Sequence, residues 1–368
     1  MKFTEITKEE FRSYAEKSPY QSFMQTPEIA TLREKDGWTP HYLAMKDGNK
    51  IIAATLLVSK PTFLGKRTFI APGGPLLDFS DTKLAKSFLT HLKSYAKSHK
   101  GYTLQISPYY ELIERDRHGA PVQGGFNYTK ATNTLKSLGF KPLSHPSQPQ
   151  YMFAMNLKNR TPDQLFSEMK SNTRNHIRKA EKMGVTVREL KREELPILKR
   201  ITESTSVRRG FTDRPLSYYE QMYDLFTPRG EIKFLVAEAL TDQPATKQPA
   251  SAHAAAPTPL SAAMFMLVGH EIVYLFSGSD EKYMKDYNAQ YLIQWEIIKY
   301  AATHGYDTYN FYGIHGLPDE DTNDGIYDFK KGFTSEATGR VIELLGTYGA
   351  PISTPIYKLH HLLSRLKP

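Results

Sequence analysis

The sequence predicts a mixed α/β or α+β protein that is built from two domains. Its 368 residues exceed the usual size of a single hydrophobic core. Strand-like and helix-like segments are mixed along the whole chain, which argues against an all-α or all-β class. Two segments, 93–106 and 298–311, also resemble each other, and this similarity favours a duplicated domain.

Apolar residues that alternate with polar ones, or that run between Gly and Pro, predict the strands, and apolar residues at helical spacing predict the helices. The predicted strands lie at 41–46, 51–59, 67–71, 102–107, 151–157, 232–238, 262–268, 271–277 and 307–312. The predicted helices lie at 7–17, 26–36, 82–99, 131–138, 162–183, 192–208, 215–225, 287–304 and 354–366.

The two similar segments, "KSYAKSHKGYTLQI" and "IKYAATHGYDTYNF", share a helix end with Tyr-Ala, then His, a glycine break and a strand. Gly101 and Gly305 are expected just after each helix, where a left-handed backbone conformation favours glycine. An apolar hairpin precedes each copy, at 51–75 and 260–279. Hairpin, helix and strand in the same order twice support duplication, although two generic α/β units with the same turn chemistry would look similar.

The segment 240–263, "LTDQPATKQPASAHAAAPTPLSAA", is rich in Ala, Pro, Ser and Thr and lacks aromatic residues. It has too little apolar surface to offset the entropy lost on ordering. We expect a flexible loop between two strands, and we interpret it as an insertion rather than a binding motif.

Charge and composition narrow the class of protein further. Lys and Arg number 48 against 39 Asp and Glu, a net charge of +9 that favours an anionic partner such as nucleic acid, a nucleotide or a membrane surface. The absence of cysteine excludes disulfides, thiolate catalysis and cysteine-ligated zinc. The N-terminal residues lack the apolar core of a signal peptide and no apolar run reaches 18 residues, so we expect a cytoplasmic protein, with membrane-surface binding left open.

A basic helix is predicted in "SNTRNHIRKAEKMGV". Arg174, Arg178 and Lys182 are four residues apart and share one face, and His176 and Lys179 flank it. The opposite face carries the apolar residues Phe166, Met169, Ile177 and Ala180. A row of cations one turn apart can follow a phosphodiester backbone. The alternative is an ordinary solvated basic face.

A second basic motif is "RRGFTDRPLSYY". Gly210 and Pro215 predict a loop, with Arg214 directly before the proline that opens the next helix. We expect Asp213 or a neighbour to cap that helix. A helix N-terminus beside an arginine suits a diphosphate, and the alternative for Arg214 is an internal salt bridge.

The third motif is "FKKGF", which follows a strand and an acidic loop. Lys330 lies between aromatic residues, an environment in which a lysine can stabilise an oxyanion or bind a carboxylate. The alternative is a structural lysine packed beside Phe329 and Phe333. The acidic residues of the loop do not have EF-hand spacing, so no metal site is predicted. The chain also lacks G-x-x-x-x-G-K-[ST], G-x-G-x-x-G, G-x-S-x-G and H-E-x-x-H motifs.

Five motifs in order, "SNTRNHIRKAEKMGV", "FTDRPLSYYEQM", "VYLFSGS", "NFYGIHG" and "IYDFKKGF", resemble the Fem family of peptidoglycan bridge aminoacyltransferases. The resemblance covers nearly the whole chain. It implies two acetyltransferase-like (GNAT-type) domains, the first at 1–150 plus 342–368 and the second at 151–341. The helix at 354–366 would return to the first domain. The loop 240–263 is too short and Pro-rich for the helical arm of longer members.

The resemblance also implies an activity. Family members transfer an amino acid from aminoacyl-tRNA to the stem-peptide amine of a peptidoglycan precursor, which is either UDP-MurNAc-pentapeptide or lipid-linked. Both substrates are polyanions, which suits the net positive charge. The basic helix, with Arg174, Arg178, Lys179 and Lys182, would bind the tRNA. No cofactor is expected, and we expect a monomer that is able to associate peripherally with a membrane.

Several site residues are implied by matching positions. Arg33 and Arg214 match the two cationic positions that hold the precursor diphosphate, with Arg33 in place of a lysine of some relatives. Lys330 matches the Phe-Lys-x-x-Phe lysine near the tRNA end and the reacting ester, and is expected to be catalytic. Phe276 stands where some members have a tyrosine near the acceptor peptide.

Other positions depart from the family pattern. Tyr102 and Ser107 are expected to border the same cleft and contact substrate. However, Ser107-Pro108 replaces an Asp-Pro pair of some relatives, so no catalytic carboxylate is supplied there. Gly73 replaces a basic residue, so that phosphate contact is not expected.

The expected chemistry is direct aminolysis of an activated ester, without an acyl-enzyme, because the chain has no cysteine and no Ser-His-acid signature. One alternative is an acetyl-CoA-dependent N-acyltransferase, but neither hairpin is followed by the R/Q-x-x-G-x-G/A loop that would hold a pyrophosphate. Another is a non-enzymatic tRNA-binding module, which would bind RNA in a salt-sensitive way and form no product.

Overall fold

The computed structural model describes residues 1–144, 146, 148–210, 212–241, 256–317, 325–353 and 356–357. These residues divide into two compact units. Unit 1 contains the described residues of Met1–Met152, Gly313–Pro318 and Val341–Pro368, and unit 2 contains those of Phe153–Tyr312 and Asp319–Arg340.

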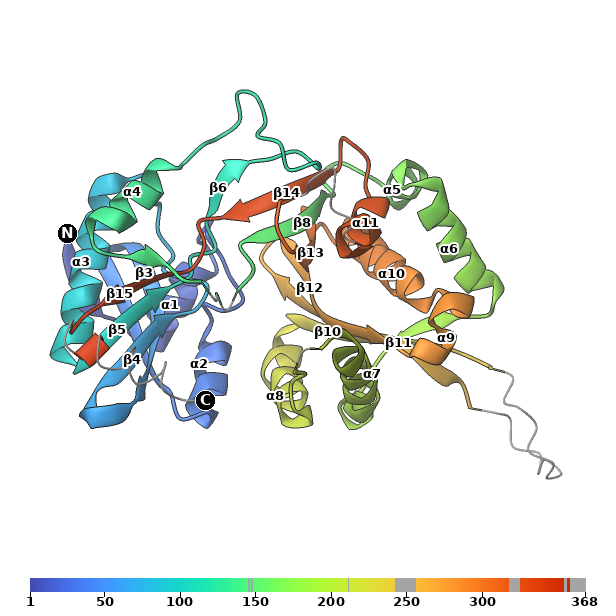
Figure 1. The fold of residues 1–368 in the computed structure, drawn as a ribbon, viewed down its shortest axis with the longest axis horizontal. Coiled ribbons are helices and arrows are strands. Elements are labelled where there is room, and N and C mark those ends of the chain that lie inside the picture. The colour runs from blue at the N-terminus through green and yellow to red at the C-terminus, as the bar shows by residue number, and fades with distance from the viewer. Residues whose placement is uncertain are drawn as a thin grey trace. The chain divides into compact units, whose positions relative to one another are not determined.

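The helices and strands follow one another along the chain as labelled in Figure 1. Up to residue 142 they are β1 (Lys2–Glu5), α1 (Lys8–Ala15), α2 (Pro27–Lys35), β2 (Thr39–Asp47), β3 (Lys50–Pro61), β4 (Arg67–Ala71), α3 (Thr82–Ser98), β5 (Gly101–Ile106), β6 (Glu111–Glu114), α4 (Lys130–Ser137) and β7 (Lys141–Pro142). From residue 151 they are β8 (Tyr151–Asn156), α5 (Pro162–Glu168), α6 (Ser171–Lys182), β9 (Thr186–Glu189), α7 (Leu195–Arg209), α8 (Leu216–Phe226), β10 (Ile232–Ala239), β11 (Thr258–Val268), β12 (Glu271–Ser279), α9 (Glu281–Tyr287), α10 (Ala289–Thr303), β13 (Thr308–Gly313), α11 (Gly325–Gly332), β14 (Gly339–Leu344) and β15 (Tyr348–Pro351).

Unit 1 is organised around a seven-stranded sheet with the order β1-β2-β3-β4-β5-β15-β7. Asp81 caps the N-terminus of α3, because its carboxylate accepts a hydrogen bond from the Leu84 backbone N–H at 2.9 Å. Its apolar face, with Leu84, Phe88 and Leu92, is buried in the same core as Phe69 of β4. Burial of each such side chain contributes about 1.5–3 kcal/mol, so this core fixes α3 on the sheet.

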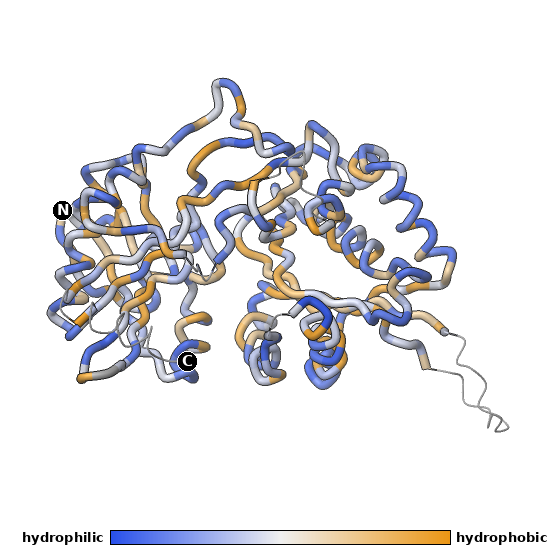
Figure 2. The backbone as a smooth tube through the Cα atoms, viewed as in Figure 1, coloured by the Kyte–Doolittle hydropathy of each residue, from blue (hydrophilic) through white to orange (hydrophobic). Residues whose placement is uncertain are grey.

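The second sheet has eight strands in the order β6-β14-β8-β13-β12-β11-β10-β9. In unit 2, α7 and α8 cover one face of this sheet and α10 covers the other, with α5 and α6 packed against α10 (Figure 1). Hydrophobic residues concentrate in the strands, whereas α6 is largely hydrophilic along its length (Figure 2). The sheet therefore supplies the core, and α6 is a surface helix.

The predicted duplication appears as the same order of elements twice. The antiparallel pair β3–β4 precedes α3 and the parallel strand β5, and the antiparallel pair β11–β12 precedes α10 and the parallel strand β13. The two copies differ at the parallel pair. β4 and β5 pair as far as Ala71 and Ile106, but β12 and β13, both fully described, pair only from Glu271 to Val273 on the β12 side.

Strand β12 leaves its parallel neighbour next to a β-bulge. Met264 of β11 lies opposite Phe276 and Phe265 lies opposite Tyr274, so Leu275 is the extra residue. A bulge bends its strand and redirects the side chains beside it, and bulges are frequent next to active sites. The end of β12 is therefore separated from β13 where Phe276 and Tyr312 are found.

The predicted helix at 162–183 is wrong as a single element, because two helices, α5 and α6, form there. Met169 and Lys170 between them are extended, with ψ angles of 154° and 141°. The Arg174 guanidinium donates to the carbonyls of Ser167 and Met169, and the Lys170 N–H donates to the carbonyl of Gly332 at 2.9 Å. These contacts satisfy the polar groups that the break exposes.

Two further expectations need correction. Gly305 has φ +78° after α10, as predicted, but Gly101 is the first residue of β5 and Lys100 takes the left-handed conformation with φ 62°. Glycine is needed at 101 for space, because a Cβ there would lie 2.5 Å from the Ala96 carbonyl oxygen. The loop predicted at 240–263 is also too long, since β11 begins at Thr258 and pairs with β10.

The predicted helix at 354–366 lies outside the described residues apart from Ile356 and Tyr357, which are helical.

Candidate active site

Lys330 lies near the end of α11, a helix absent from the sequence-based prediction. Its side chain is buried, with the residue 5% exposed, and its Nζ donates a hydrogen bond to the Tyr312 carbonyl oxygen at 3.2 Å. Phe333, which is fully buried, and Phe329 contact each other with ring centroids 5.3 Å apart. Lys330 is therefore buried, and its two aromatic neighbours in the sequence pack against each other.

Tyr312, at the end of β13, is the residue that links Lys330 to other site residues. Its φ of 66° is unusual for a bulky residue, and its backbone N–H donates to the Asn310 side-chain oxygen at 2.7 Å. Burial raises the pKa of the Tyr312 hydroxyl; Tyr218 raises this pKa further and Arg214 lowers it. A strained conformation of this kind costs roughly 1–3 kcal/mol and is found at functional sites.

Arg214 is exposed and lies just before α8. Its guanidinium sits 5.3 Å from the centre of the Tyr218 ring, within cation–π range. Among the described residues no carboxylate forms an ion pair with Arg214, so the alternative of an internal salt bridge finds no support in that part of the chain.

The expectation that Asp213 caps α8 is wrong. Its carboxylate instead accepts hydrogen bonds from Tyr219 at 2.7 Å, Thr202 at 2.9 Å and Lys199 at 3.0 Å. Burial alone would raise the pKa of Asp213, but these hydrogen bonds outweigh burial and hold the pKa below its ordinary value. Asp213 thus joins α7 to α8, and no side chain caps the N-terminus of α8.

Phe276 belongs to the same group of residues. It follows the bulge of β12 and packs edge-on against Tyr218 and Tyr219, with centroid distances of 5.9 and 5.8 Å. The structure therefore brings three predicted residues, Arg214, Phe276 and Lys330, into one cluster of unit 2 through Tyr218 and Tyr312.

A second set of rings surrounds Lys330 on the side of α6 and α10. The Tyr291 ring contacts Phe329 at 5.0 Å, Phe333 at 5.7 Å and His176 at 4.5 Å between centroids. Burial lowers the pKa of His176, and the neighbouring Lys179 lowers it further. His176 is therefore neutral at neutral pH and behaves as an aromatic ring.

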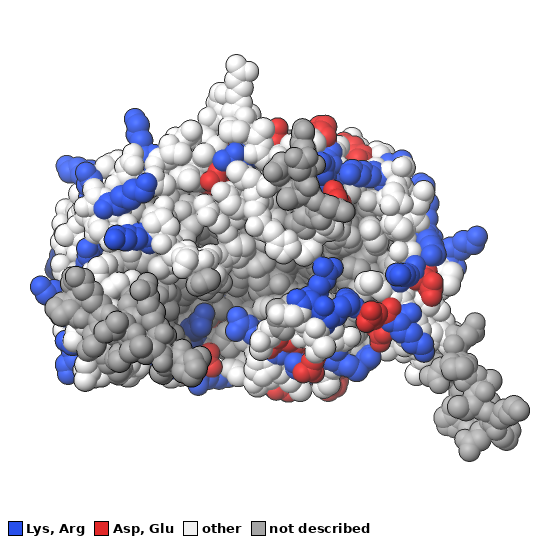
Figure 3. Space-filling view, in the orientation of Figure 1, with Lys and Arg blue, Asp and Glu red and all other residues white. Residues whose placement is uncertain are grey.

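The four predicted tRNA-binding residues all lie on α6, in a region of unit 2 where Lys and Arg side chains are numerous (Figure 3). Arg178, Lys179 and Lys182 are exposed. Arg178 covers the Phe166 ring at 5.3 Å, and Lys179 donates to the Lys285 carbonyl at 3.3 Å. Arg174 is half-buried and its guanidinium holds the end of α5, which is a structural role.

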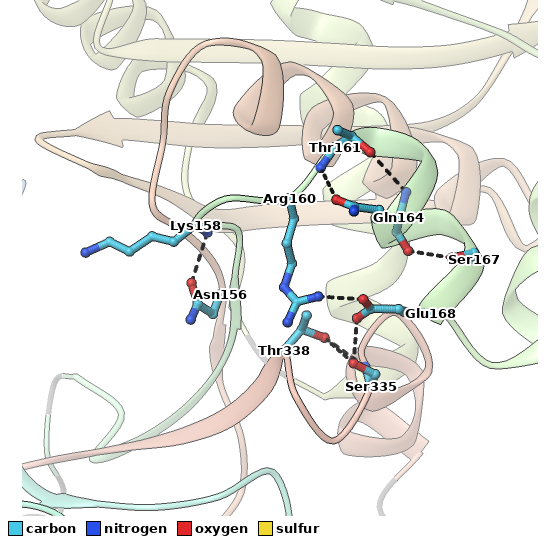
Figure 4. A network of polar contacts seen from close by, with 9 residues as sticks. All are labelled: Asn156, Lys158, Arg160, Thr161, Gln164, Ser167, Glu168, Ser335 and Thr338. Carbon is cyan, nitrogen blue, oxygen red and sulfur yellow. Dashed lines mark hydrogen bonds and ion pairs between the residues drawn. The ribbon is translucent and has the colours of Figure 1, made fainter.

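A polar network fixes the turn that follows α11, as Figure 4 shows. The Glu168 carboxylate at the end of α5 accepts from Arg160 and, at 2.7 Å, from the Ser335 hydroxyl. The Ser335 backbone N–H donates to Thr338 at 2.8 Å. Gly332 allows α6 to approach, because a Cβ there would lie 2.4 Å from the Thr173 hydroxyl. Both ends of the α5–α6 break are thus anchored to the segment that carries Lys330.

The remaining predicted site residues lie in unit 1. Arg33 is half-buried in the last turn of α2. Tyr102 and Ser107 are 5% and 4% exposed, and the Ser107 hydroxyl accepts from the Gly73 N–H at 3.3 Å and donates to the Ala71 carbonyl at 3.4 Å. Burial raises the pKa of Tyr102.

The surroundings of Gly73 explain why this chain has glycine where the resemblance to the family implies a basic residue. It has φ +68°, and a Cβ would lie 2.4 Å from the Ser22 hydroxyl. A basic side chain would therefore clash at this position in this chain.

Sequence reasoning missed Tyr218, Tyr291 and Tyr312 as site residues. Tyr218 and Tyr312 fall within the quoted motifs "FTDRPLSYYEQM" and "NFYGIHG", which could have drawn attention to them. Tyr291 had no sequence signal beyond its aromatic character.

The described residues contain no group of three or more His, Asp or Glu side chains placed to hold a metal ion. None of the helices in this part of the chain is both long and apolar enough to cross a bilayer.

Comparisons with known proteins agree on one relationship. A family model described as "FemAB family" matches residues 6–243 and 237–365. The chain is 29% identical to "Aminoacyltransferase FemA" of Staphylococcus aureus strain bovine RF122 / ET3-1, over all of this chain and 99% of the relative. That alignment spans 424 positions, more than the 368 residues here, so the relative contains segments that this chain lacks.

Solved structures show the same fold. The crystal structure of FemX matches with a TM-score of 0.79 and 22% identity, covering 98% of this chain and 99% of that one. A tandem GNAT protein from the clavulanic acid biosynthesis pathway matches with a TM-score of 0.54 and 11% identity, covering 96% and 98%. The predicted fold of two GNAT-like domains is confirmed.

Proposed function

Because the chain belongs to the FemAB family, we propose that it is an aminoacyltransferase that moves an amino acid from aminoacyl-tRNA to the stem-peptide amine of a peptidoglycan precursor. The observation that carries this proposal is the arrangement around Tyr312. Its carbonyl accepts from buried Lys330, and its hydroxyl lies within electrostatic reach of Arg214. A cation suited to a reacting ester and a cation suited to a phosphate are therefore close to one residue.

The reaction is an ester aminolysis. The neutral acceptor amine attacks the ester carbonyl, a C–N bond forms and the bond to the tRNA 3′ oxygen breaks. The amine loses a proton and the 3′ oxygen gains one. Because the ester is already activated, positioning and charge stabilisation supply most of the rate. In this proposal the Lys330 ammonium stabilises the tetrahedral oxyanion or the departing 3′ oxygen.

The precursor is proposed to bind through its diphosphate. Arg214 and the uncapped N-terminus of α8 offer a guanidinium and backbone N–H groups, which together favour a phosphate. Arg33 is the second cation assigned to this ligand. Phe276 is assigned to the acceptor peptide, and Tyr102 and Ser107 to the substrate-binding region of the first domain, although both are buried in unit 1.

The donor is proposed to bind along α6, with Arg178, Lys179 and Lys182 as phosphate contacts and Arg174 at their base. Units 1 and 2 are taken as the two acetyltransferase-like domains. In this proposal the enzyme is a cytoplasmic monomer, and it meets the precursor either as the UDP-linked compound or at the membrane surface as the lipid-linked one.

A transfer assay tests the proposal. Purified protein is mixed with UDP-MurNAc-pentapeptide or the lipid-linked precursor and a pool of charged tRNAs, and the precursor mass is measured. We expect an increase of one or more amino-acid residues, at least about a hundred-fold slower with Lys330→Ala. Lys331→Ala, on the same helix, is the matched control and should keep the activity. Tight tRNA binding without a product from either acceptor would refute the transferase in favour of a binding module, and transfer only from acetyl-CoA would indicate the other enzyme class.

A further inference from the structure

We propose that His176, Tyr291 and Phe329 form a stacking surface for the unpaired 3′ nucleotides of the donor RNA, between the basic residues of α6 and Lys330. This inference rests on the proposed function and deepens it. It assigns a binding role to residues that come from three different helices, α6, α10 and α11. The ligand is defined by its chemistry as single-stranded ribonucleotides next to a reactive ester.

The rings form an unbroken series of contacts. His176 lies 4.5 Å from Tyr291, and Tyr291 lies 5.0 Å from Phe329, measured between ring centroids. Phe329 directly precedes Lys330 in the chain. The other end of the series, His176, lies on α6, the helix that carries Arg178 and the other predicted RNA contacts. It therefore connects the basic helix to the predicted catalytic lysine.

The rings differ in exposure in the way that a binding surface requires. Phe333 and Phe311, which lie underneath, are 0% and 1% exposed, whereas His176, Tyr291 and Phe329 are all partly exposed. Phe333 stacks on Tyr291 with the ring planes 26° apart. A buried floor thus supports three rings that reach the surface. Their partial exposure leaves part of each ring accessible to a ligand.

The position of this surface is fixed by backbone contacts. The Lys170 N–H at the start of α6 donates to the Gly332 carbonyl at the end of α11, at 2.9 Å. The missing side chain of Gly332 leaves room for Thr173. Helices α6 and α11 are therefore held together, and the rings they carry keep their spacing without a ligand.

The chemistry of the surface selects unpaired nucleotides. Neutral aromatic rings offer stacking, which every base accepts on its flat face, while nearby cations bind phosphates. The low pKa of the His176 imidazole keeps this ring uncharged at neutral pH. Bases within a duplex are already stacked on their neighbours, so only the single-stranded end of a tRNA can use the rings. The same end carries the ester that must reach Lys330.

The test compares binding of two RNAs to wild-type and variant proteins. One is an intact tRNA, and the other is the same tRNA without its unpaired 3′ nucleotides. We expect the wild type to bind the intact RNA more tightly. His176→Ala should weaken binding of the intact RNA by about five-fold or more and leave the shortened RNA unaffected. His176→Phe, which keeps a ring, should restore the preference.

A matched control exists in the same unit. His304 stacks on Tyr300 at 3.9 Å and is exposed, so His304→Ala removes an equivalent ring pair away from Lys330. It should change neither affinity. His176→Gln replaces His176→Ala if the alanine variant does not fold.

The proposal would be overturned if His176→Ala weakened both RNAs equally, or neither, or if His176→Phe failed to restore the preference. Failure of the proposed function gives a different result. In that case wild-type protein forms no aminoacyl product, whatever its preference between the two RNAs. Product formation with no preference between them refutes the stacking surface alone.

Discussion

At the scale of single residues, His41 shows how a partly buried polar group is held in unit 1. Its Nδ1 is 3.0 Å from the Tyr95 hydroxyl, and its Nε2 is 2.9 Å from the Ser59 hydroxyl. Tyr95 donates its proton to Glu5 at 2.8 Å, so Nδ1 of His41 must donate and Nε2 must accept. Arg67 donates to Ser59 at 2.9 and 3.0 Å, which completes the chain of hydrogen bonds.

This arrangement predicts a loss of stability in acid. Burial lowers the pKa of His41 to about 4, and His99 and Arg67 add to the effect while Glu5 opposes it. The unfolded state keeps a pKa near 6.5, so it binds the proton first and unfolding becomes easier as pH falls from 6.5 to 4. At about 1.4 kcal/mol per pKa unit, the free energy of unfolding can fall by at most roughly 3 kcal/mol. The partial exposure of the ring reduces this loss to about 1–2 kcal/mol.

Urea unfolding at pH 7 and pH 5 measures this effect. Each unit contains one tryptophan, so Trp38 reports on unit 1 once Trp295 is replaced by Phe. His41→Gln cannot take up the proton, and its free energy of unfolding should fall less between the two pH values than that of the parent protein. An equal fall in both proteins would show that His41 does not contribute.

Single residues also show where sequence reasoning succeeds and where it stops. Lys330 and Arg214 could be selected from the sequence, because their neighbours Phe329, Phe333 and Pro215 define a local environment. Tyr312 lies in a quoted motif, but its left-handed conformation was not predicted, because tyrosine rarely adopts it, and the hydrogen bond from its N–H to the Asn310 side chain appears only in the structure. The assignment of Asp213 as a cap failed for a similar reason, since its partners come from α7 and α8.

At the scale of elements, α10 and β13 are joined by a buried polar contact. The Tyr309 hydroxyl of β13 donates to the Gln294 side-chain oxygen at 2.6 Å, and both residues are fully buried. Among the described residues the Gln294 side-chain nitrogen has no hydrogen-bond partner. Such a pair stabilises the packing only while both members are present, because either one alone is a buried unsatisfied group.

A double-mutant cycle tests this contact. Gln294→Leu and Tyr309→Phe should each lower the free energy of unfolding of unit 2 by about 1–3 kcal/mol. The double variant should lose clearly less than the sum, because it leaves neither group unpaired. Unfolding is followed by Trp295 fluorescence in a Trp38→Phe background. Losses that simply add would mean that the hydrogen bond does not couple the helix to the strand.

The elements themselves were predictable to different degrees. All nine predicted strands are present, because each has an apolar pattern that can be recognised in its own sequence. The strands that were missed, such as β9 and β15, have four residues each and exist through pairing with distant partners. The break between α5 and α6 was missed because helical periodicity continues across it, and only the Gly332 carbonyl and Arg174 reveal what stabilises it.

At the scale of the whole molecule, duplication and net charge could be recognised in the sequence because each depends on many residues. The net charge of +9 is a total, however, and it does not show which cations act. Helix α6 differs from other basic helices because its three exposed cations lie on the helix that also carries His176 of the proposed stacking surface. Helix α3 of unit 1 provides a comparison with three exposed lysines, Lys83, Lys86 and Lys97.

The last prediction uses this difference. Replacing Arg178, Lys179 and Lys182 by Gln lowers the net charge from +9 to +6, as does replacing the three α3 lysines. If α6 contacts RNA phosphates, only its variant should reduce the slope of log affinity for tRNA against log salt, by about 2–3, because each lost contact releases one counterion fewer. Binding is measured between 50 and 200 mM salt. Equal effects of the two triple variants would mean that tRNA responds to the total charge, and the assignment of α6 as its binding site would then be abandoned.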